Sequence, residues 1–450
     1  MKPSIKTPID RSIVKQEITA LGLESVGLAS IRELNRIVNN IEAATGERFI
    51  RMEMGVPGLD PPKIAVDAEI EALKKGVGSK YPPFDGIPEL KQEISRFVKN
   101  FIDVEINPVS CFPTVGSMQG CYMAMMCSTR RIKGKDRLLF IDPGFPVNKL
   151  QARVLGVPHD HFDVYEFRGK KLESKLESYL KKGDVAALMY SNPNNPAWIC
   201  FTEQELEIIG RLATKYDCLV MEDLAYFGMD FRKDYSQPGQ PPFIPSVAHY
   251  TDNYILLISS SKSFSLAGQR IGMTAIPDKL FTSKADNLKD WFGTDKFGYA
   301  YIFGAMYALS SGVSHSNQYG LCGLLKAVND GQYNFVDSVK EYGDRAAVMK
   351  RLFVENGFKI VYDMDEGEKI ADGFYFTISF PGFTGEELVE ELLYYGISAI
   401  SLTTTGSDRH EGLRACVSLT GKDRFQDFEN RVAQFKRDHP EGSDFKIIGS

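Results

Sequence analysis

Lys262 is the residue of this chain whose surroundings most clearly predict chemistry. It follows the apolar run YILLIS at 254–259, which is typical of a buried strand. Ser259 and Ser261 precede it, and Arg270 follows eight residues later. A lysine amine at a strand end can form a Schiff base with a carbonyl, while serines and an arginine can bind an anion beside that carbonyl. The alternative is a solvated lysine in a serine-rich loop.

One cofactor carries both of the groups that this segment is suited to bind. Pyridoxal 5'-phosphate contains an aldehyde and a phosphate, and the stretch 254–272 has residues for each. Polar residues also follow other apolar runs, and these extend the prediction.

Asp223 and Asn195 lie where two further apolar runs end. Asp223 closes CLVMED, and Tyr226 comes three residues later. A buried carboxylate needs a partner, and either a protonated pyridine nitrogen or an arginine elsewhere in the fold would serve. Asn195 belongs to the NPNNP turn, which is also typical of an ordinary Asn-Pro turn.

Two more segments predict a phosphate site and a stacking surface. We expect a helix to begin near Ser117, where the backbone N–H groups of Gly116 and Ser117 suit a phosphate at the positive helix end. A plain N-cap is the alternative. Phe145, in a PGFP turn, offers a phenyl face to a flat ring, although aromatic residues more often pack in a core.

The elements that must position these residues alternate between strands and helices. One helical pattern begins with a capping box of Thr202 and Glu205. Near-continuous apolar strands alternating with helices predict an α/β fold with a mostly parallel sheet flanked by helices. Such sheets bind ligands at the carboxyl ends of their strands. The strands that we expect are 136–142, 184–192, 218–223, 254–259 and 272–277.

The length of 450 residues predicts two domains. The sheet and its helices would form a large domain over 56–325. The C-terminal part, 326–450, would form a smaller α+β domain that the helical N-terminal segment, 1–55, joins. We expect the final stretch, HPEGSDFKIIGS, to be loosely attached.

The composition argues against nucleic-acid and membrane partners. Apolar residues make up 43% and charged residues 25%, with a net charge of -6. The sequence shows neither a signal-peptide core nor an apolar stretch near the roughly 18 residues that a membrane helix needs. The seven cysteines are scattered, without a CxxC pair, so we expect reduced thiols and a cytoplasmic protein.

The cluster HDHFD at 159–163 contains possible metal ligands. It follows a turn and has a strand-like alternation, in which successive side chains face opposite sides. This pattern favours a surface strand, and we expect no metal.

Together these segments resemble the class I/II aminotransferases of the aspartate aminotransferase fold, which are fold type I pyridoxal-phosphate enzymes. The resemblance runs from about Gly55 to Arg414. SSSKSFSLAGQRIG matches the SxSKxxxxxGxRxG segment of the family, and DLAY matches its DxxY. The order and spacing of the motifs are together more specific than any one of them.

The resemblance implies a role for each residue of the cofactor site. Lys262 would form the Schiff base and later move a proton, and Asp223 would pair with the pyridine nitrogen. Tyr226 and Asn195 would hydrogen-bond the phenolic oxygen, while Phe145 would stack on the ring. The phosphate would be bound by Ser117, Met118, Ser259, Ser261, Arg270 and Tyr81.

Tyr81 implies a homodimer with shared active sites. YPPFDGIPELKQEI resembles the family segment whose tyrosine crosses to the phosphate of the neighbouring subunit. This residue would therefore act only in the dimer.

Three residues would bind the substrate. GLRACVS resembles the segment whose arginine pairs with the α-carboxylate, so Arg414 would form a bidentate pair there. EMGVPGLDPP resembles the GxP segment that sets Gly55 against the same carboxylate, and Asn195 would also contact the substrate. The chain departs from the usual NPTG or NPSG, because Ala197 and Trp198 follow Asn195-Pro196.

The resemblance implies a ping-pong aminotransferase that acts on an L-amino acid and a 2-oxo acid, with a biosynthetic role in amino acid metabolism. A pyridoxal-phosphate C–S lyase that eliminates at the β carbon would keep the same motifs. A ligand-sensing domain of a transcription regulator shares the fold. The segment before Gly55 is short for a DNA-binding domain, and the net charge is acidic.

Overall fold

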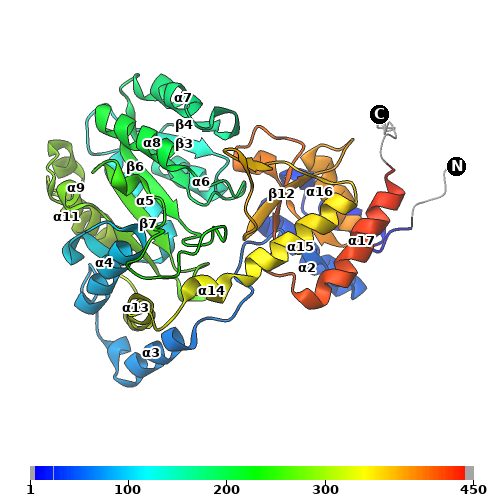
Figure 1. Ribbon diagram of the computed structural model, residues 1–450, viewed down its shortest axis with the longest axis horizontal. Coiled ribbons are helices and arrows are strands. Elements are labelled where there is room, and N and C mark those ends of the chain that lie inside the picture. Colours follow the sequence, from blue (N-terminus) through cyan, green and yellow to red (C-terminus); the bar gives the residue numbers. More distant parts are fainter. Residues whose placement is uncertain (1–5, 24, 441–450) are drawn as a thin grey trace. The chain divides into compact units, whose positions relative to one another are not determined.

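The computed structural model describes residues 6–23 and 25–440 (Figure 1). These residues form two compact units. The larger unit comprises Leu59–Asn194 and Ile199–Lys340, and the smaller one comprises the described parts of Met1–Gly58, Asn195–Trp198 and Glu341–Ser450. The domain boundaries predicted at 55/56 and 325/326 stay predictions. Most of the C-terminal HPEGSDFKIIGS stretch and the first residues of the predicted N-terminal segment lie outside the described residues.

Within the described ranges, a seven-stranded sheet forms the centre of the larger unit. Its strands are β2 (Cys111–Thr114), β3 (Arg137–Asp142), β4 (His159–Asp163), β5 (Val185–Ser191), β6 (Leu219–Leu224), β7 (Tyr254–Ser259) and β8 (Gly272–Ala275). They follow the order β2-β8-β7-β6-β5-β3-β4. β8 is antiparallel to both of its neighbours, and the strands from β7 to β4 are parallel.

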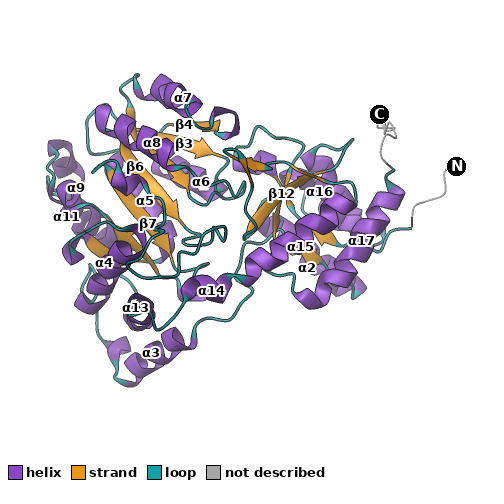
Figure 2. Cartoon of the chain, in the orientation of Figure 1, coloured by secondary structure: helices purple, strands orange, loops and turns teal. Residues whose placement is uncertain are grey.

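This sheet confirms the predicted α/β class and all five predicted strands. β5, β6, β7 and β8 are buried along their whole length, because apolar residues point to both faces. Helices cover a sheet of this kind and exclude water from both faces (Figure 2).

Helices of the larger unit connect and cover these strands. α5 packs on β5, β6, β7 and β8, and α8 packs on β6. The capping box predicted at Thr202 and Glu205 is present at the start of α8. The helices are α3 (Lys63–Lys74), α4 (Pro88–Ile102), α5 (Gly116–Ser128), α6 (Pro146–Leu155), α7 (Lys171–Leu180), α8 (Glu203–Lys215), α9 (Asp278–Thr282), α10 (Lys289–Phe292), α11 (Phe297–Tyr299), α12 (Tyr307–Ser310), α13 (His315–Asn329) and α14 (Phe335–Val339).

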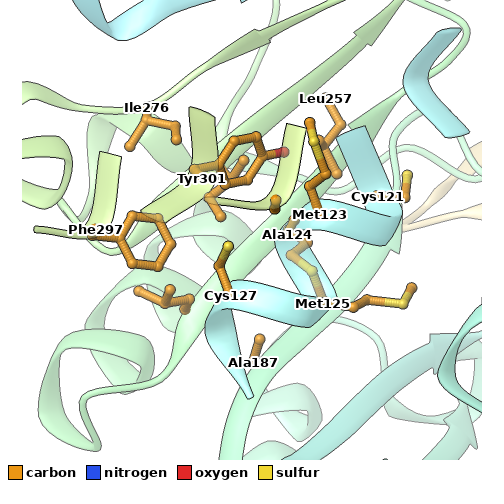
Figure 3. Packing of buried hydrophobic residues seen from close by; sticks show 14 of the residues in the cluster. Cys121, Met123, Ala124, Met125, Cys127, Ala187, Leu257, Ile276, Phe297 and Tyr301 are labelled. Atoms are coloured by element: carbon orange, nitrogen blue, oxygen red, sulfur yellow. The ribbon is translucent and has the colours of Figure 1, made fainter. Parts of the chain in front are cut away.

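The hydrophobic core between α5 and the sheet shows which side chains of β6 face α5. Met123, Ala124 and Leu257 are among its members (Figure 3). Leu219 and Met221 of β6 also lie in this core. Side chains alternate along a strand, so Asp223 is on the same face as these two residues, toward α5.

The smaller unit has its own sheet. In the described part of the chain, four antiparallel strands follow the order β14-β15-β12-β9, while β1 pairs with β13 and β10 with β11. Its elements are α1 (Arg11–Ala20), α2 (Ile31–Thr45), β1 (Ile50–Arg51), α15 (Glu341–Glu355), β9 (Lys359–Ile360), β10 (Met364–Asp365), β11 (Glu368–Lys369), β12 (Tyr375–Ser379), α16 (Gly385–Tyr394), β13 (Ile397–Ser398), β14 (Ile400–Ser401), β15 (Leu413–Cys416) and α17 (Phe425–Asp438).

Two global features bear on the sequence predictions. Over residues 6–23 and 25–440, no helix has the length and apolar character required to cross a bilayer. In the same part of the chain, none of the seven cysteines forms a disulfide.

Candidate active site

The carboxyl ends of β6 and β7 bring the predicted cofactor residues to one edge of the sheet. Asp223 pairs in register with Leu257 of β7, and Ser259, the last residue of β7, pairs with Gly272 of β8. The turn that carries Lys262 follows Ser259 directly. This is the edge at which sheets of this class bind ligands.

Two glycines bring the start of α5 close to β8 and to an arginine. A Cβ atom on Gly272 would lie 2.7 Å from the backbone nitrogen of Ser117. One on Gly116 would lie 2.8 Å from Nη2 of Arg270, and the φ angle of Gly116, 64°, also disfavours a side chain. Because Gly272 pairs with Ser259, the serine, the first turn of α5 and the guanidinium gather at one place.

The electrostatics of this place favour an anion. Val115, the N-cap residue of α5, provides no side-chain cap, so the first backbone N–H groups carry the positive end of the helix dipole. Arg270 is exposed, and its Nη1 donates to the carbonyl of Ala267 at 2.8 Å. The Ser259 Oγ accepts the backbone N–H of Ser261 at 3.1 Å, which leaves its hydroxyl hydrogen available to donate. These groups can bind a phosphate.

Asp223 is a buried carboxyl group whose Oδ1 atom receives no hydrogen bond from the described residues. Burial raises the pKa of Asp223 to about 7, although the backbone N–H of Ala225 acts in the opposite direction. Burial, and next the charge of Asp223, raise the pKa of the Cys121 thiol on α5. A buried acceptor of this kind fits a ligand that brings an N–H group.

Hydrogen bonding holds the Lys262 turn beside the end of β6. Ser263, which is fully buried, donates from Oγ to the carbonyl of Phe227 at 2.8 Å. Phe227 follows Tyr226, whose side chain is also buried. Lys262, which is half-buried, and Tyr226, which is buried, therefore lie on turns that are hydrogen-bonded to each other.

Phe145 and Asp223 line the same small cavity at this edge of the sheet. Phe145 is half-buried and is the N-cap residue of α6. Asn148, in the first turn of α6, also lines the cavity, and its Nδ2 donates to Gln151 at 3.3 Å. Sequence reasoning missed Asn148. Its spacing of three residues from Phe145 at a helix start was the signal that could have found it.

The segment HDHFD forms β4, as its alternation predicted. His161 Nδ1 lies 2.9 Å from Oδ2 of Asp142, and Lys149 contacts the same carboxylate oxygen. Asp142 is buried and lines the cavity with Phe145. The histidine thus pairs with the carboxylate at the end of β3.

Arg414, in the smaller unit, is a buried cation without an acidic partner among the described residues. It lies on β15 and is only 1% exposed. Nη2 donates to the backbone carbonyl of Glu53 at 2.5 Å, and Nε has no partner. Because a buried charge is unfavourable unless it is paired, this guanidinium suits an anionic ligand.

Tyr375 connects Arg414 to Gly55 within the same unit. The Cζ atom of Arg414 lies 4.7 Å from the centre of the Tyr375 ring. A Cβ atom on Gly55 would lie 1.9 Å from the Tyr375 hydroxyl oxygen, so position 55 has no space for a side chain. Sequence reasoning identified Gly55 and Arg414 but missed Tyr375.

The other predicted residues take varied positions. Met118 is in the first turn of α5, where its carbonyl accepts the Gln151 side chain at 2.8 Å. Asn195 is buried and belongs, by its contacts, to the smaller unit. Tyr81 is 93% exposed, and no hydrogen bond to its side chain occurs among the described residues.

The family described as aminotransferase class I and II matches residues 47–423. The chain belongs to this family. Relatives bear this activity in their names. A probable aspartate aminotransferase of Methanocaldococcus jannaschii is 25% identical over 347 residues, which cover 73% of this chain and 88% of the relative. An LL-diaminopimelate aminotransferase of Natranaerobius thermophilus is 30% identical over 259 residues, covering 56% of this chain and 64% of the relative.

Solved structures share the fold of this aminotransferase. The alanine aminotransferase of Pyrococcus furiosus superposes with a TM-score of 0.73 at 20% identity, over 93% of this chain and 98% of the other. An aspartate aminotransferase of Thermus thermophilus with maleate gives 0.72 at 18% identity, over 94% and 98% of the two chains. These structural similarities confirm the predicted fold, and the family match over residues 47–423 confirms the predicted family.

The aminotransferase departs from the usual pattern at Trp198. This residue has a φ angle of 64° and is fully buried. A Cβ atom on Gly373 would lie 2.0 Å from Cε2 of the indole, so the ring fills the space that a larger residue at 373 would need. The large side chain is therefore accommodated by a glycine far away in the sequence.

Proposed function

We propose that this aminotransferase moves an amino group between an L-amino acid and a 2-oxo acid in ping-pong order, with pyridoxal 5'-phosphate held by Lys262 through a Schiff base. When bound, the cofactor supplies an aldehyde that accepts the amino group and a ring that withdraws electrons from the substrate. The observation that carries the proposal is the buried, unpartnered Oδ1 of Asp223 beside the Lys262 turn.

The residues of the larger unit fit this cofactor. The Asp223 carboxyl group suits a ring N–H, and its charge would keep the ring nitrogen protonated. Ser117, Ser259 and Arg270 suit the phosphate, because two glycines keep their places free of side chains. Phe145 shares a cavity with Asp223, which suits stacking on a flat ring.

Lys262 would do the proton chemistry. Nζ of Lys262 would take the proton from the substrate Cα, hold it, and deliver it to the aldehyde carbon of the cofactor. Tyr226 and Asn195 would donate hydrogen bonds to the phenolic oxygen of the ring, and so fix its orientation.

Arg414 would bind the α-carboxylate of the substrate. Its guanidinium is buried, Nε has no partner, and no carboxylate of the described residues pairs with it, which favours a bidentate pair with a substrate carboxylate. Gly55 and Asn195 are proposed to contact the same substrate. All amino acids and 2-oxo acids carry this carboxylate, so Arg414 would serve both half-reactions.

The active unit is proposed to be a homodimer. A continuous helical stretch, Phe297–Ser310, presents Tyr299, Phe303 and Tyr307 at spacings of four residues, and all three are about half exposed. Phe84 contacts Tyr307 with ring centres 4.8 Å apart. An exposed aromatic stripe of this kind is typical of a protein interface. A cytoplasmic location and a biosynthetic role stay predictions from the sequence.

Absorbance spectroscopy of the purified, cofactor-loaded protein tests the proposal. We expect an L-amino acid donor to remove the absorbance band of the lysine-bound cofactor, and a 2-oxo acid to restore it. Removal and recovery in two separable steps are the signature of ping-pong transfer. Steady release of pyruvate and ammonia from a cysteine-like donor, without loss of the band, would instead indicate the lyase, which no observation in the structure favours.

Lys262→Ala and Lys262→Arg are the variants for this test. Both should retain the cofactor through the phosphate site and lose the exchange, since neither offers an amine that can bind and move a proton at neutral pH. Full activity in Lys262→Ala would refute the role of the lysine.

A further inference from the structure

A carboxylate-binding guanidinium works only if its plane is fixed. A bidentate pair needs both N–H groups directed at the two carboxylate oxygens. The carbonyl of Glu53 holds one atom of Arg414, Nη2, and one contact leaves the plane of the group free to turn about it. Something else must therefore set that plane.

The Tyr375 ring is placed to do this. It lies against Cζ of Arg414 at 4.7 Å from the ring centre, within the range of a cation–π contact. Tyr375 is on β12, and its neighbour Thr377 pairs in register with Arg414 of β15. The ring and the guanidinium therefore project from adjacent strands of one sheet.

Tyr375 is itself held on two sides. Its ring meets the ring of Phe374 edge to face at 5.1 Å and the indole of Trp198 at 6.2 Å with an angle of 71°. It is 2% exposed, and its hydroxyl occupies the space beside Gly55. A ring enclosed in this way has little freedom to tilt.

Trp198 is the unexpected part of this arrangement. Its φ angle of 64° is one that residues other than glycine rarely adopt, yet its side chain is fully buried against Gly373. A position that favours glycine but carries the largest side chain indicates that the indole has a function there.

We propose that Tyr375 and Trp198 are positioning residues for the substrate carboxylate: Tyr375 fixes the plane of the Arg414 guanidinium, and Trp198 fixes Tyr375. This inference rests on the proposed function, in which Arg414 binds the α-carboxylate. It adds a reason for the chain's departure from the usual turn sequence.

The test compares an amino acid with the amine that lacks its carboxylate, for example L-phenylalanine and 2-phenylethylamine, in single half-reactions of the cofactor-loaded protein. Tyr375→Leu removes the ring. We expect it to raise the apparent dissociation constant of the amino acid by about 10- to 30-fold while the limiting rate changes little. The reaction of the amine, which Arg414 does not bind, should stay within about threefold of the native value.

Two further variants keep the result interpretable. Tyr375→Phe retains the ring and should leave amino acid binding within about threefold of the native value. Trp198→Gly suits the backbone angle and should weaken amino acid binding selectively, but less than Tyr375→Leu does.

Each outcome decides between distinct conclusions. Equal losses with amine and amino acid, or no loss with the amino acid in Tyr375→Leu, would overturn the positioning role. If Trp198→Gly left the ratio of the apparent dissociation constants for the amino acid and the amine unchanged, the part of the inference that concerns Trp198 would be overturned. A native protein that reacts with no donor would overturn the proposed function, and this inference with it.

Discussion

Two adjacent carboxyl groups on β6 show what distinguishes a site residue from a structural one. Asp223 and Glu222 are both buried, and burial raises the pKa of each to about 7. Glu222 accepts hydrogen bonds from Tyr190 at 3.1 Å and from Ser246, whereas Oδ1 of Asp223 has no donor among the described residues. Burial and a raised pKa therefore do not separate Asp223 from Glu222, and the missing donor does.

This contrast predicts that two isosteric substitutions differ in their effect on the rate. Asp223→Asn removes the charge that would face the ring nitrogen, so we expect the half-reaction with an amino acid to slow by about 10- to 100-fold, the value of one charged hydrogen bond. Glu222→Gln alters the other face of the same strand and should leave that rate unchanged. Stopped-flow absorbance measures both, and equal rates in native protein and Asp223→Asn would contradict the assignment of Asp223.

At the scale of elements, the close approach of α5 and β8 is a condition for the proposed phosphate site. A Cβ atom on Gly272 would lie 2.7 Å from the backbone nitrogen of Ser117, whereas one on Gly268, four residues earlier, would have no atom within 4 Å. A methyl group therefore fits at Gly268 but not at Gly272.

Gly272→Ala should push the first turn of α5 away from Ser259. We expect the cofactor to bind about 5- to 100-fold more weakly, in proportion to the strain of inserting a methyl group into a packed site. Gly268→Ala is the matched control and should bind the cofactor normally. Fluorescence titration of the cofactor-free protein measures both constants, and unchanged binding in Gly272→Ala would argue against a phosphate at this helix terminus.

Ser246, in the segment that follows β6, donates a hydrogen bond to the buried carboxyl group of Glu222 on β6. The titration of Glu222 predicts that the stability of the fold depends on pH. The pKa of Glu222 is raised to about 7 by burial, so the folded chain binds this proton more tightly than the unfolded chain, in which the pKa is near 4.5. The contribution of this proton to the free energy of unfolding is therefore fully present below pH 4.5 and is lost as the pH rises through 7.

Glu222→Gln should remove this loss. Relative to the native protein, the variant should gain about 3 kcal/mol in the free energy of unfolding between pH 4.5 and 7, and the gain should stay constant above pH 7. Urea unfolding at pH 5 and pH 8 gives the difference. A gain that is the same at both values would mean that Glu222 keeps its ordinary pKa in the fold.

For the molecule as a whole, the sequence predicted the features that depend on neighbouring residues better than those that depend on contacts between distant residues. The five strands and the capping box of α8 follow from neighbouring residues and were found in the sequence. Tyr375 has no motif of its own, because its role depends on Arg414 and Trp198, which are far from it in sequence. The aromatic alternation of FYFTISF indicates a strand and cannot say which ring meets a guanidinium.

At the scale of assembly, we expect a second copy of the chain to complete the proposed active site. Tyr81 is 93% exposed and close in sequence to Phe84, which contacts the aromatic stripe through Tyr307. If the stripe forms the interface of a homodimer, this tyrosine would lie at the edge of the interface and could reach the phosphate of the neighbouring subunit. We therefore expect Tyr81→Phe to weaken cofactor binding by about tenfold, the value of one hydrogen bond to a charged group.

Mixed dimers separate this role from one within the same chain. Tyr81→Phe and Lys262→Ala chains each lack one part of the site, and in a mixed dimer the intact Lys262 of one chain would meet the intact Tyr81 of the other. Random reassortment makes half of the dimers mixed, with one complete site in each, so at limiting cofactor we expect recovery of about a quarter of native activity. If Tyr81 instead served its own chain, no site in the mixture would be complete and mixing would restore nothing. Sedimentation of the same samples, in which a monomer would exclude sharing altogether, provides the independent check.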